Sequence, residues 1–383
     1  MIIMKFGGSS LESASAIQRA AAIVKGSLAS HPAVVVSAIG KTTNRLLHIA
    51  EFAAQGDALT AWRKLLALEA DHLQIAAKLG ITVDREIEAL FGELRGDILE
   101  IASLGSISPS LWDRVASFGE RLSSLIVTAA LRKTGVPAKH LDARRLIVTD
   151  AHHTEAAPLT IETYAKVRRA IPCADRSLVP VLGGFIASAE DGTPTTLGRG
   201  GSDYTASLIG AAINADEIQI WTDVDGMLTC DPRVREGGQC LKSITYEEAE
   251  EMARLGAKVL HPETIAPARK QRVPVMIRNS RNPSHPGTLI TAAACETGVA
   301  KSIATQPDLG RVALVGTGIH PHASRAQEAL RRAGISATLS EVSYLRILFQ
   351  SEPQSVTSAV DVLHREFFEV APRSPERLAL AAA

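Results

Sequence analysis

The feature that most constrains the fold is the first 37 residues, where two short apolar segments enclose a glycine turn and an amphipathic stretch. Ile2–Phe6 predicts a strand. Ala33–Ser37 (AVVVS) predicts a second strand, and its continuous apolar run is typical of a strand buried in a parallel sheet. Between them, apolar residues recur at helical spacing from about Ser10 to Leu28. Strand, helix and strand in this order form a βαβ unit, so we expect a parallel sheet covered by helices.

Helical and strand patterns continue to alternate up to about residue 290. Residues 43–134 are predicted to be mostly helical, and later strands are predicted at Ala138–Leu141, Leu178–Ser188, Glu217–Thr222 and Val273–Asn279. This alternation predicts a three-layer α/β/α domain with an open, mainly parallel sheet over residues 1–290.

A segment rich in Pro, Ser and Gly, Ser280–Thr288, marks an expected domain boundary. Beyond it, strand and helix patterns predict a smaller ferredoxin-like (βαββαβ) domain over residues 291–371. Residues 372–383 are expected to form a C-terminal tail without a packing partner.

Composition excludes several classes of function. The chain has 383 residues with 41 basic and 41 acidic side chains, so the basic excess of a nucleic-acid or membrane-surface binder is missing. No apolar run approaches the roughly 20 residues of a membrane span, and the N-terminus does not look like a signal peptide. The four cysteines are scattered, which indicates reduced thiols. We therefore expect a cytoplasmic protein without nucleic-acid or membrane partners.

The stretch MKFGGSS (Met4–Ser10) suggests a phosphate site at the end of the first strand. Gly7, Gly8 and Ser9 would let the backbone approach a phosphate closely, and Lys5 could reach the same phosphate from the sheet. Ser9 and Glu12 fit a capping box, which would start the helix just after the glycines. A plain strand–helix turn with a solvated lysine is the alternative.

A second glycine-rich stretch, TTLGRGGSDYTASLIGAA, begins at Thr195. Its three glycines flank Arg199, whose guanidinium can bind a carboxylate or phosphate with two hydrogen bonds. Ser202 and Asp203 are expected to cap a helix that begins near Tyr204. A flexible loop is the alternative, but an arginine, three glycines and a helix start within six residues favour an anion site.

Three weaker signals complete the set. In SFGERLSS, Glu120 is either a solvated charge or a ligand for a substrate ammonium. In IWTDVDGMLTCDPRV, a strand runs into an Asp-Gly turn, where α/β sheets bind ligands. In LGAKVLHPET, Lys258 follows a second predicted capping box, Thr245–Glu248. The chain has neither GxSxG nor HExxH, and its paired histidines lack partners at metal spacing, so we expect no metal site.

These stretches, taken in order, resemble aspartate kinases of the amino-acid kinase family over essentially the whole chain. The matching blocks are KFGGSS, VVVSAIGKTTN, SFGER, TTLGRGGSDYTA, WTDVDGMLTCDPR and GAKVLHP. The resemblance implies an open sheet with ATP across the carboxyl edge of its strands. It also implies ATP-dependent phosphorylation of the side-chain carboxylate of L-aspartate, giving 4-phospho-L-aspartate for lysine, threonine, methionine and diaminopimelate synthesis. Mg²⁺ would enter with ATP.

The resemblance also implies residue roles. The catalytic residues are Lys5, which contacts the transferring phosphate, and Asp203, which lies with Ser202 between substrate and phosphates. The amino-acid substrate is bound by Ser37, Thr43, Glu120 (amino group), Arg199 (α-carboxylate) and Ser202. The nucleotide is bound by Lys5, Gly7, Gly8, Ser9, Thr222, Asp223, Arg233 and Lys258.

The chemistry agrees with this interpretation. A side-chain carboxylate with a pKa of about 4 is ionised at neutral pH, so no general base is needed to activate it. The protein must instead position two anions and neutralise charge on the moving phosphoryl group.

The sequence also departs from the family. Leu228 stands where tyrosine is common, which puts one nucleotide contact in doubt. The segment after residue 290 is long enough for one of the two ACT domains that these kinases usually carry. From this we expect weak or absent feedback inhibition, and a homodimer formed through the ACT domain. Two alternatives stay open: a related kinase for another amino-acid carboxylate, and an inactive amino-acid sensor.

Overall fold

The computed structural model describes residues 1–172, 177–256, 262–293 and 296–369. The chain divides into two compact units, residues 1–225 with 263–291 and residues 226–262 with 292–383. This division differs from the expected boundary at residue 290, because residues 226–262 group with the C-terminal part. The reason lies in long-range contacts. Thr229 bonds His364, Arg235 pairs with Asp361, and Cys230 forms a β-bridge to Ile303.

The first unit contains most of the regular structure. Its strands are β1 (Ile2–Phe6), β2 (Pro32–Val36), β3 (Ala138–Leu141), β4 (Val148–Thr149), β5 (Val179–Gly183), β6 (Ile186–Ala189), β7 (Pro194–Thr196), β8 (Glu217–Thr222), β10 (Val275–Asn279) and β11 (Thr288–Thr291). Its helices are α1 (Ala14–Gly26), α2 (Thr42–Ala54), α3 (Ala58–Leu79), α4 (Asp84–Leu104), α5 (Pro109–Lys133), α6 (Thr160–Ala170), α7 (Gly201–Ile213) and α9 (Ala266–Gln271).

The main sheet of this unit follows the order β3-β5-β2-β1-β8-β10-β11. All neighbours in this order are parallel except β10 and β11, which are antiparallel. β4, β6 and β7 form a separate small sheet. β1 lies in the middle of the main sheet, with β2 on one side and β8 on the other. The strand order therefore changes direction at β1, and ligands of open α/β sheets bind at such a point, beyond the carboxyl ends of the strands.

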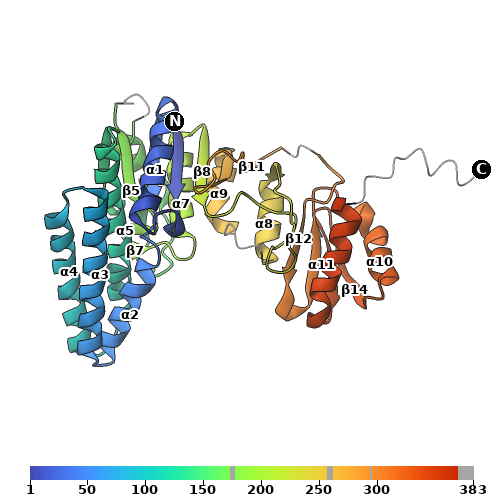
Figure 1. Cartoon of the computed structure of the whole chain (residues 1–383), viewed down its shortest axis with the longest axis horizontal. Coiled ribbons are helices and arrows are strands. Elements are labelled where there is room, and N and C mark those ends of the chain that lie inside the picture. Colours follow the sequence, from blue (N-terminus) through green and yellow to red (C-terminus); the bar gives the residue numbers. More distant parts are fainter. Residues whose placement is uncertain (173–176, 257–261, 294–295, 370–383) are drawn as a thin grey trace, which may run out of the picture. The chain divides into compact units, whose positions relative to one another are not determined.

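Two helical layers cover this sheet. Ile2, Met4 and Phe6 of β1 are buried in one core cluster with residues of α1 and α5. Side chains alternate along a strand, so Lys5 points to the opposite face, where α7 packs against β1, β2 and β8. Figure 1 shows α2, α3, α4 and α5 as a bundle of long helices, which confirms the helical region predicted at 43–134.

The start of α1 was predicted wrongly. Gly8–Ser10 form a short 3₁₀ turn, and α1 begins at Ala14 with Ser13 as its N-cap, whose hydroxyl accepts from Ala16 N at 3.2 Å. Glu12 of the expected capping box and its neighbour Ser10 make tertiary contacts instead. Ser10 Oγ lies 2.7 Å from Ser280 Oγ, and Glu12 pairs with Arg281.

Two further local predictions need correction. α7 begins at Gly201 after Gly200, so Ser202 and Asp203 lie in its first turn and do not cap it. The strand expected over Leu178–Ser188 is two strands, because the chain turns at Gly183–Phe185 and Phe185 has a φ of 65°. Two glycines and a left-handed residue interrupt the extended backbone there.

The second unit contains β9 (Ser243–Thr245), α8 (Tyr246–Arg254) and a four-stranded antiparallel sheet with two helices. The sheet has the order β12-β13-β15-β14 and consists of β12 (Ser302–Gln306), β13 (Arg311–Val315), β14 (Ala337–Val342) and β15 (Arg346–Ser351). α10 (Ala323–Arg332) and α11 (Val356–His364) pack against each other, and residues of both lie in the core cluster with the strands. The capping box predicted at Thr245–Glu248 is present at the start of α8.

The fold class is therefore confirmed: a three-layer α/β domain with an open, mainly parallel sheet, and a ferredoxin-like C-terminal sheet. The chain order of the second part differs from βαββαβ. It is ββαββα, and β12 occupies the edge beside β13 where the last strand of a βαββαβ unit would lie. A hairpin from the preceding strand can fill this edge because the neighbour is antiparallel.

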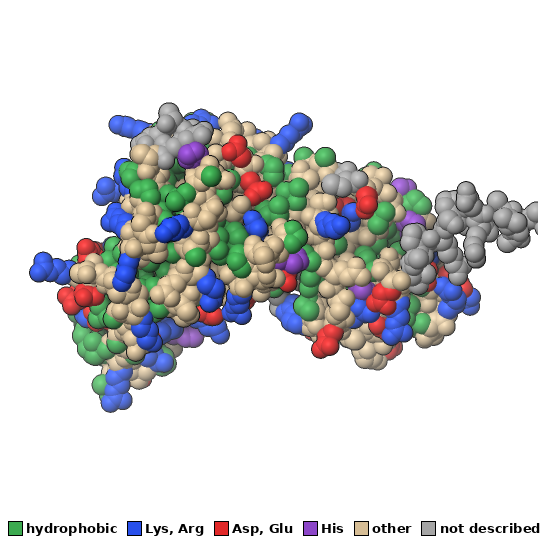
Figure 2. Space-filling view, turned by 45° about the horizontal axis from the view of Figure 1, so that its top comes forward, with side chains coloured by type: hydrophobic (Ala, Val, Ile, Leu, Met, Phe, Trp, Pro, Cys, Tyr) green, Lys and Arg blue, Asp and Glu red, His purple; other side chains and the backbone are tan. Residues whose placement is uncertain are grey.

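Basic and acidic side chains of the described residues are interspersed over the face shown in Figure 2. This agrees with the formal net charge of zero. None of the helices in the described ranges has the length and apolar character needed to cross a bilayer.

Candidate active site

A cleft of about 270 Å³ opens beyond the carboxyl ends of β1, β2 and β5 in the first unit. It is lined by Lys5, Gly8, Ser37, Ala38, Gly40, Thr43, Glu120, Phe185, Gly198, Gly200, Gly201, Ser202 and Asp203. The main sheet changes direction at β1, so this is where its topology predicts a ligand. Most of the predicted phosphate and substrate residues meet in this one cleft.

The ion pair between Lys5 and Asp203 connects the sheet to α7. Lys5 Nζ lies 2.7 Å from Asp203 Oδ1, and Lys5 is only 8% exposed. The lysine lies on the face of β1 opposite the large apolar cluster, while Asp203 comes from the first turn of α7. A buried ammonium held at the end of a strand can approach an anion in the cleft without a large rearrangement.

The glycine turn after β1 is required by close packing. A β-carbon on Gly8 would lie 2.7 Å from Gly40 O and 3.1 Å from Ala38 O, so a side chain would collide with the loop after β2. Gly7 N donates to Trp221 O at 3.1 Å, which ties the turn to β8. Ser9 lies within the 3₁₀ turn Gly8–Ser10. The backbone of this turn therefore forms one wall of the cleft.

Glu120 is a deeply buried carboxylate of the cleft with only part of its hydrogen-bonding capacity used. It lies in the middle of α5, is 4% exposed, and accepts a hydrogen bond from Ala38 N at its Oε1, 3.1 Å away. Its other oxygen, Oε2, is buried and has no hydrogen-bond partner among the described residues. Burial raises the pKa of Glu120 to about 8, and the bond from Ala38 offsets only part of this. A ligand cation beside Oε2 would supply the missing partner.

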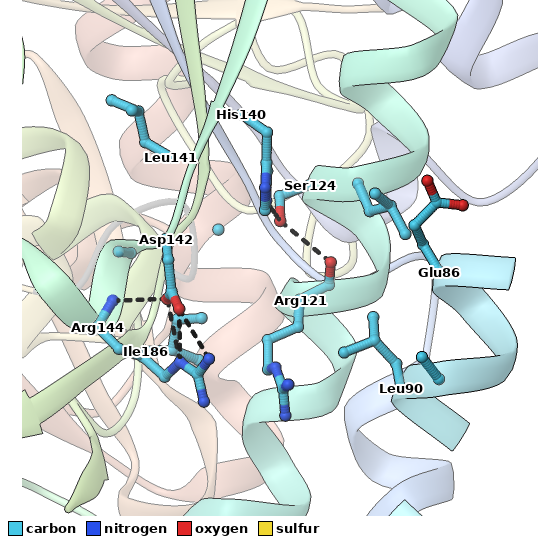
Figure 3. Close-up of a pocket in the computed structure, with 13 residues that line it drawn as sticks. Glu86, Leu90, Arg121, Ser124, His140, Leu141, Asp142, Arg144 and Ile186 are labelled. Atoms are coloured by element: carbon cyan, nitrogen blue, oxygen red, sulfur yellow. Dashed lines mark hydrogen bonds and ion pairs between the residues drawn. The ribbon is translucent and has the colours of Figure 1, made fainter. Parts of the chain in front are cut away.

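The neighbouring charged residue, Arg121, does not line this cleft. Its Nη2 lies 2.6 Å from Glu93, and its guanidinium lies over the ring of Phe118, 4.4 Å from the centroid. Arg121 lines a separate pocket of about 300 Å³ with His140, Asp142 and other residues, shown in Figure 3. Successive residues of a helix point in different directions, so Glu120 reaches the cleft while Arg121 does not.

The segment before α7 brings a second set of groups. Gly200 has a φ of 71°, a left-handed conformation that favours glycine, and directly precedes the helix. Ser202 is 8% exposed and packs so closely that a β-carbon on Gly184 would lie 2.7 Å from its Cα. Arg199 is exposed, and the glycines on either side of it line the cleft.

Ser37 and Thr43 flank the loop between β2 and α2. Ser37 N donates to Phe6 O at 3.0 Å, which holds the end of β2 beside β1. Both side chains line the cleft and are half-buried. Ser37 directly precedes Ala38, whose N–H binds Glu120, and Thr43 lies in the first turn of α2.

The predicted nucleotide residues are not all brought into this cleft. Thr222 ends β8 and its hydroxyl lies 3.2 Å from Asp223 Oδ1. Arg233 belongs to the second unit, where it is exposed and pairs with Asp231 at 2.5 Å, which raises its pKa. Lys258 lies outside the described residues. The structure therefore leaves the nucleotide assignments as predictions.

Sequence reasoning missed several residues of the cleft. Phe185 lines it, and its N–H donates to Thr205 Oγ1 at 3.0 Å. A β-carbon on Gly183 would lie 2.8 Å from Glu120 Cβ, so this glycine makes room for α5. The doublet Gly183-Gly184 inside the predicted strand Leu178–Ser188 was the available signal. Ala38 and Gly40 carry no signal of their own, because they act through the backbone.

Residues 1–279 match the model of a known family, the "Amino acid kinase family". This span covers most of the chain, and the chain belongs to this family. The resemblance to aspartate kinases is confirmed as well. The chain is 37% identical to "Aspartokinase 2, chloroplastic" of Arabidopsis thaliana over 76% of its own length and 54% of the relative's. It is 37% identical to "Lysine-sensitive aspartokinase 3" of Escherichia coli (strain K12), over 76% of its own length and 64% of the relative's.

The solved structures agree with the fold. Aspartokinase III of E. coli, in complex with aspartate and ADP, superposes with a TM-score of 0.83 and 25% identity, over 96% of this chain and 100% of that chain. The aspartate kinase of Clostridium acetobutylicum has a TM-score of 0.80 at 22% identity over 96% of this chain and 100% of that chain, which shows the fold alone. The chain spans between 54% and 66% of the length of the first curated relatives.

Proposed function

We propose that this chain transfers the γ-phosphoryl group of ATP to the side-chain carboxylate of L-aspartate. One carboxylate oxygen would form the new P–O bond, the bond from the γ-phosphorus to the β,γ-bridging oxygen would break, and ADP would leave. The products are 4-phospho-L-aspartate and ADP. The matched relatives are named aspartokinases, and the E. coli structure holds aspartate and ADP.

The observation that carries this proposal is the unpartnered Oε2 of Glu120 in the same cleft as the Lys5–Asp203 ion pair. A buried carboxylate without a partner is costly unless a ligand pairs with it. An α-ammonium group supplies a positive charge with several donors. The same amino acid then presents a negative side chain, and Lys5 offers a positive charge where phosphoryl transfer needs one.

The remaining roles follow from positions around the cleft. Arg199 would bind the α-carboxylate from the exposed segment before α7, and Ser37, Thr43 and Ser202 would contact the substrate from the cleft walls. The turn at Gly7, Gly8 and Ser9 would approach the phosphates. Thr222, Asp223, Arg233 and Lys258 would bind the nucleotide, and Mg²⁺ would arrive with ATP as part of that substrate.

A hydroxamate-coupled assay with ATP and a panel of carboxylates tests the proposal. The panel contains L-aspartate, D-aspartate, L-glutamate and succinate. We expect turnover with L-aspartate and little with succinate, because succinate lacks the ammonium that Glu120 requires. Turnover with another amino acid and none with L-aspartate would favour a related carboxylate kinase. No turnover with any of them would favour an inactive sensor.

Regulation is a separate proposal. We infer weak or absent inhibition by lysine and threonine, because the described residues contain one four-stranded antiparallel sheet of the ferredoxin-like kind. The assay above, titrated with each amino acid, tests it. Half-inhibition by sub-millimolar lysine would contradict it.

We also propose that the chain forms a homodimer and is located in the cytoplasm. β14 is the outer strand of its sheet. Val342 at its end and Tyr344 just beyond it are 43% and 59% exposed, which supports a homodimer through this sheet. Cys230 and Cys240 are not joined in a disulfide in the described part of the chain, which fits the expected cytoplasmic location. Cell fractionation would test the location.

A further inference from the structure

A buried carboxylate outside the cleft, Asp113, has no role in the proposed mechanism. It lies in the second turn of α5 and is 0% exposed. Its Oδ1 accepts from Thr196 Oγ1 at 2.5 Å, and its Oδ2 lies 2.8 Å from His153 Nδ1. Thr154 N donates to both oxygens, at 3.1 and 3.0 Å. Three residues from two distant segments thus converge on one side chain.

Asp113 bonds a segment whose backbone has an unfavourable conformation at Thr154. Thr154 has a φ of 75°, which a β-branched residue rarely adopts. Such a conformation persists only where the surroundings fix it. Here two hydrogen bonds from Thr154 N to Asp113 help to fix it, and Thr196 Oγ1 also lies 3.4 Å from Thr154 O. Asp113 therefore contributes to the shape of residues 153–155, directly and through Thr196.

Residues 153–155 in turn support the glycine segment that carries Arg199. A β-carbon on Gly198 would lie 3.1 Å from Glu155 Cγ and 3.4 Å from Thr154 O, so the two segments are in close contact. Ala156 N also donates to Thr196 O at 2.9 Å. Thr196 ends β7, only three residues before Arg199. The position of Arg199 thus depends on both the hydroxyl and the backbone contacts of Thr196.

Asp113 and Glu120 are seven residues apart on α5, so they lie on the same face of the helix, about two turns and 10 Å apart. One helix therefore carries the carboxylate at the substrate's ammonium end. It also carries the carboxylate that holds the segment at the α-carboxylate end.

We propose that Asp113 is a positioning residue, which sets the distance between Glu120 and Arg199 through Thr154 and Thr196. The inference deepens the proposed function and rests on it for the identity of the substrate. The substrate class is an α-amino acid bound at both its ammonium and its α-carboxylate. Asp113 touches neither the substrate nor the phosphates.

Steady-state kinetics on Asp113→Asn and Thr196→Val tests this role, with Thr196→Ser as the matched control that keeps the hydroxyl. We expect the first two variants to raise KM for L-aspartate on the order of tenfold, since misplacing a substrate-binding group is costly. KM for ATP should change less than about twofold. Thr196→Ser should have the wild-type KM for L-aspartate. An unchanged KM for L-aspartate in both Asp113→Asn and Thr196→Val overturns the proposal. If Asp113→Asn does not fold, the KM of Thr196→Val decides the question by itself.

A double-mutant cycle separates positioning from general destabilisation. If Thr196 acts through Arg199, then Thr196→Val should have little further effect on KM for L-aspartate in an Arg199→Gln background. Full additivity of the two effects overturns the proposed route.

Hydrogen exchange on the ligand-free full chain gives a readout independent of activity. We expect Asp113→Asn to speed exchange about tenfold in peptides covering 150–157 and 196–201, and to leave the α3 region, 58–79, unchanged. Wild-type protein that phosphorylates none of the carboxylates would refute the proposed function but leave this result intact. Unchanged exchange in both peptides would refute the role of Asp113 even in an active kinase.

Discussion

At the scale of single residues, the proposed chemistry of the cleft depends on Glu120. A carboxylate that is 4% exposed, with one oxygen lacking a partner among the described residues, favours its protonated form. Burial accordingly raises its pKa to about 8. In the proposed mechanism a substrate ammonium and a proton would therefore compete for Oε2 of Glu120.

This competition predicts the pH dependence of substrate capture. Below pH 8 the free protein carries a protonated Glu120, whose ionised fraction falls about tenfold per pH unit. We expect kcat/KM for L-aspartate to fall from pH 8 to pH 6, with a slope that approaches one below about pH 7. Glu120→Gln should give a low value without this slope. A wild-type profile that is flat over this range would contradict the assignment.

The same shift has a consequence for stability. The folded protein binds the Glu120 proton more tightly than the unfolded chain does, so this contribution to stability is present at low pH. It is lost as the pH rises from the carboxyl's ordinary pKa through about 8. Thermal melts of ligand-free wild type and Glu120→Gln at pH 6 and pH 8.5 should therefore differ more at pH 8.5, with the variant more stable.

Lys5 supports a second prediction about a single residue. Its ammonium is buried and held by Asp203, 2.7 Å away, so it is already oriented before a ligand binds. We expect Lys5→Ala to lower kcat on the order of 10²–10³, the usual effect of removing one charge-stabilising group from a transition state. Lys139→Ala, on an exposed lysine of β3, is the control and should leave kcat unchanged. Unchanged turnover in Lys5→Ala would disprove the mechanism for any substrate.

At the scale of helices and strands, the sequence pattern predicted those elements whose formation depends on neighbouring residues of the chain. The apolar runs at Ile2–Phe6 and Glu217–Thr222 became β1 and β8, and Thr245–Glu248 became a capping box. The start of α1 was missed because Ser9 fits a capping box with Glu12, whereas Ser13, the actual N-cap, has Ala16 at the matching position. Glu12, the expected partner of Ser9, instead pairs with Arg281, 269 positions away. Such a contact is invisible in the sequence.

The same limit applies to the candidate site. Lys5, Glu120, Ser202 and Asp203 could be predicted because their motifs stand in a matching order, and the structure brings them together. Asp113 could not, because it is one acidic residue in a helical stretch. Its importance comes from donors at His153, Thr154 and Thr196, 40 to 83 positions away.

Two glycine substitutions test how tightly α5 packs against the cleft. In Gly119→Ala, the new β-carbon would lie 2.8 Å from Ala38 Cβ and 3.1 Å from Thr43 Oγ1. Overpacking of this kind costs about 1–3 kcal/mol, against a gain of up to about 1 kcal/mol in helix propensity. Because Ala38 Cβ is fixed to the backbone, we expect net destabilisation.

Gly92→Ala in α4 is the matched control. No atom lies within 4 Å of its new β-carbon, so only the helix propensity changes. We expect the free energy of unfolding to rise by about 0.5–1 kcal/mol. Urea denaturation of both variants measures the effects. Stabilisation by Gly119→Ala equal to that by Gly92→Ala would show that α5 is not tightly packed there.

For the whole molecule, the proposed homodimer would form through the outer strand of the antiparallel sheet. β14 has one paired side, against β15, and an outer side where a second copy could add its own β14. The register against β15 shifts between Leu339 and Glu341, so Ser340 lies opposite no residue of β15. A change at Ser340 can therefore affect the outer side without breaking the pairing inside the sheet.

This geometry predicts the effect of Ser340→Pro on the proposed homodimer. Proline removes a backbone donor and obstructs strand pairing on its side of the ladder. We expect light scattering to give twice the chain mass of 40.6 kDa for wild type and for Ser340→Thr, which keeps the donor. Ser340→Pro should give the mass of a single chain, with an unchanged circular dichroism spectrum. A monomeric wild type, or a Ser340→Pro variant that still dimerises, would mean that β14 does not form the interface.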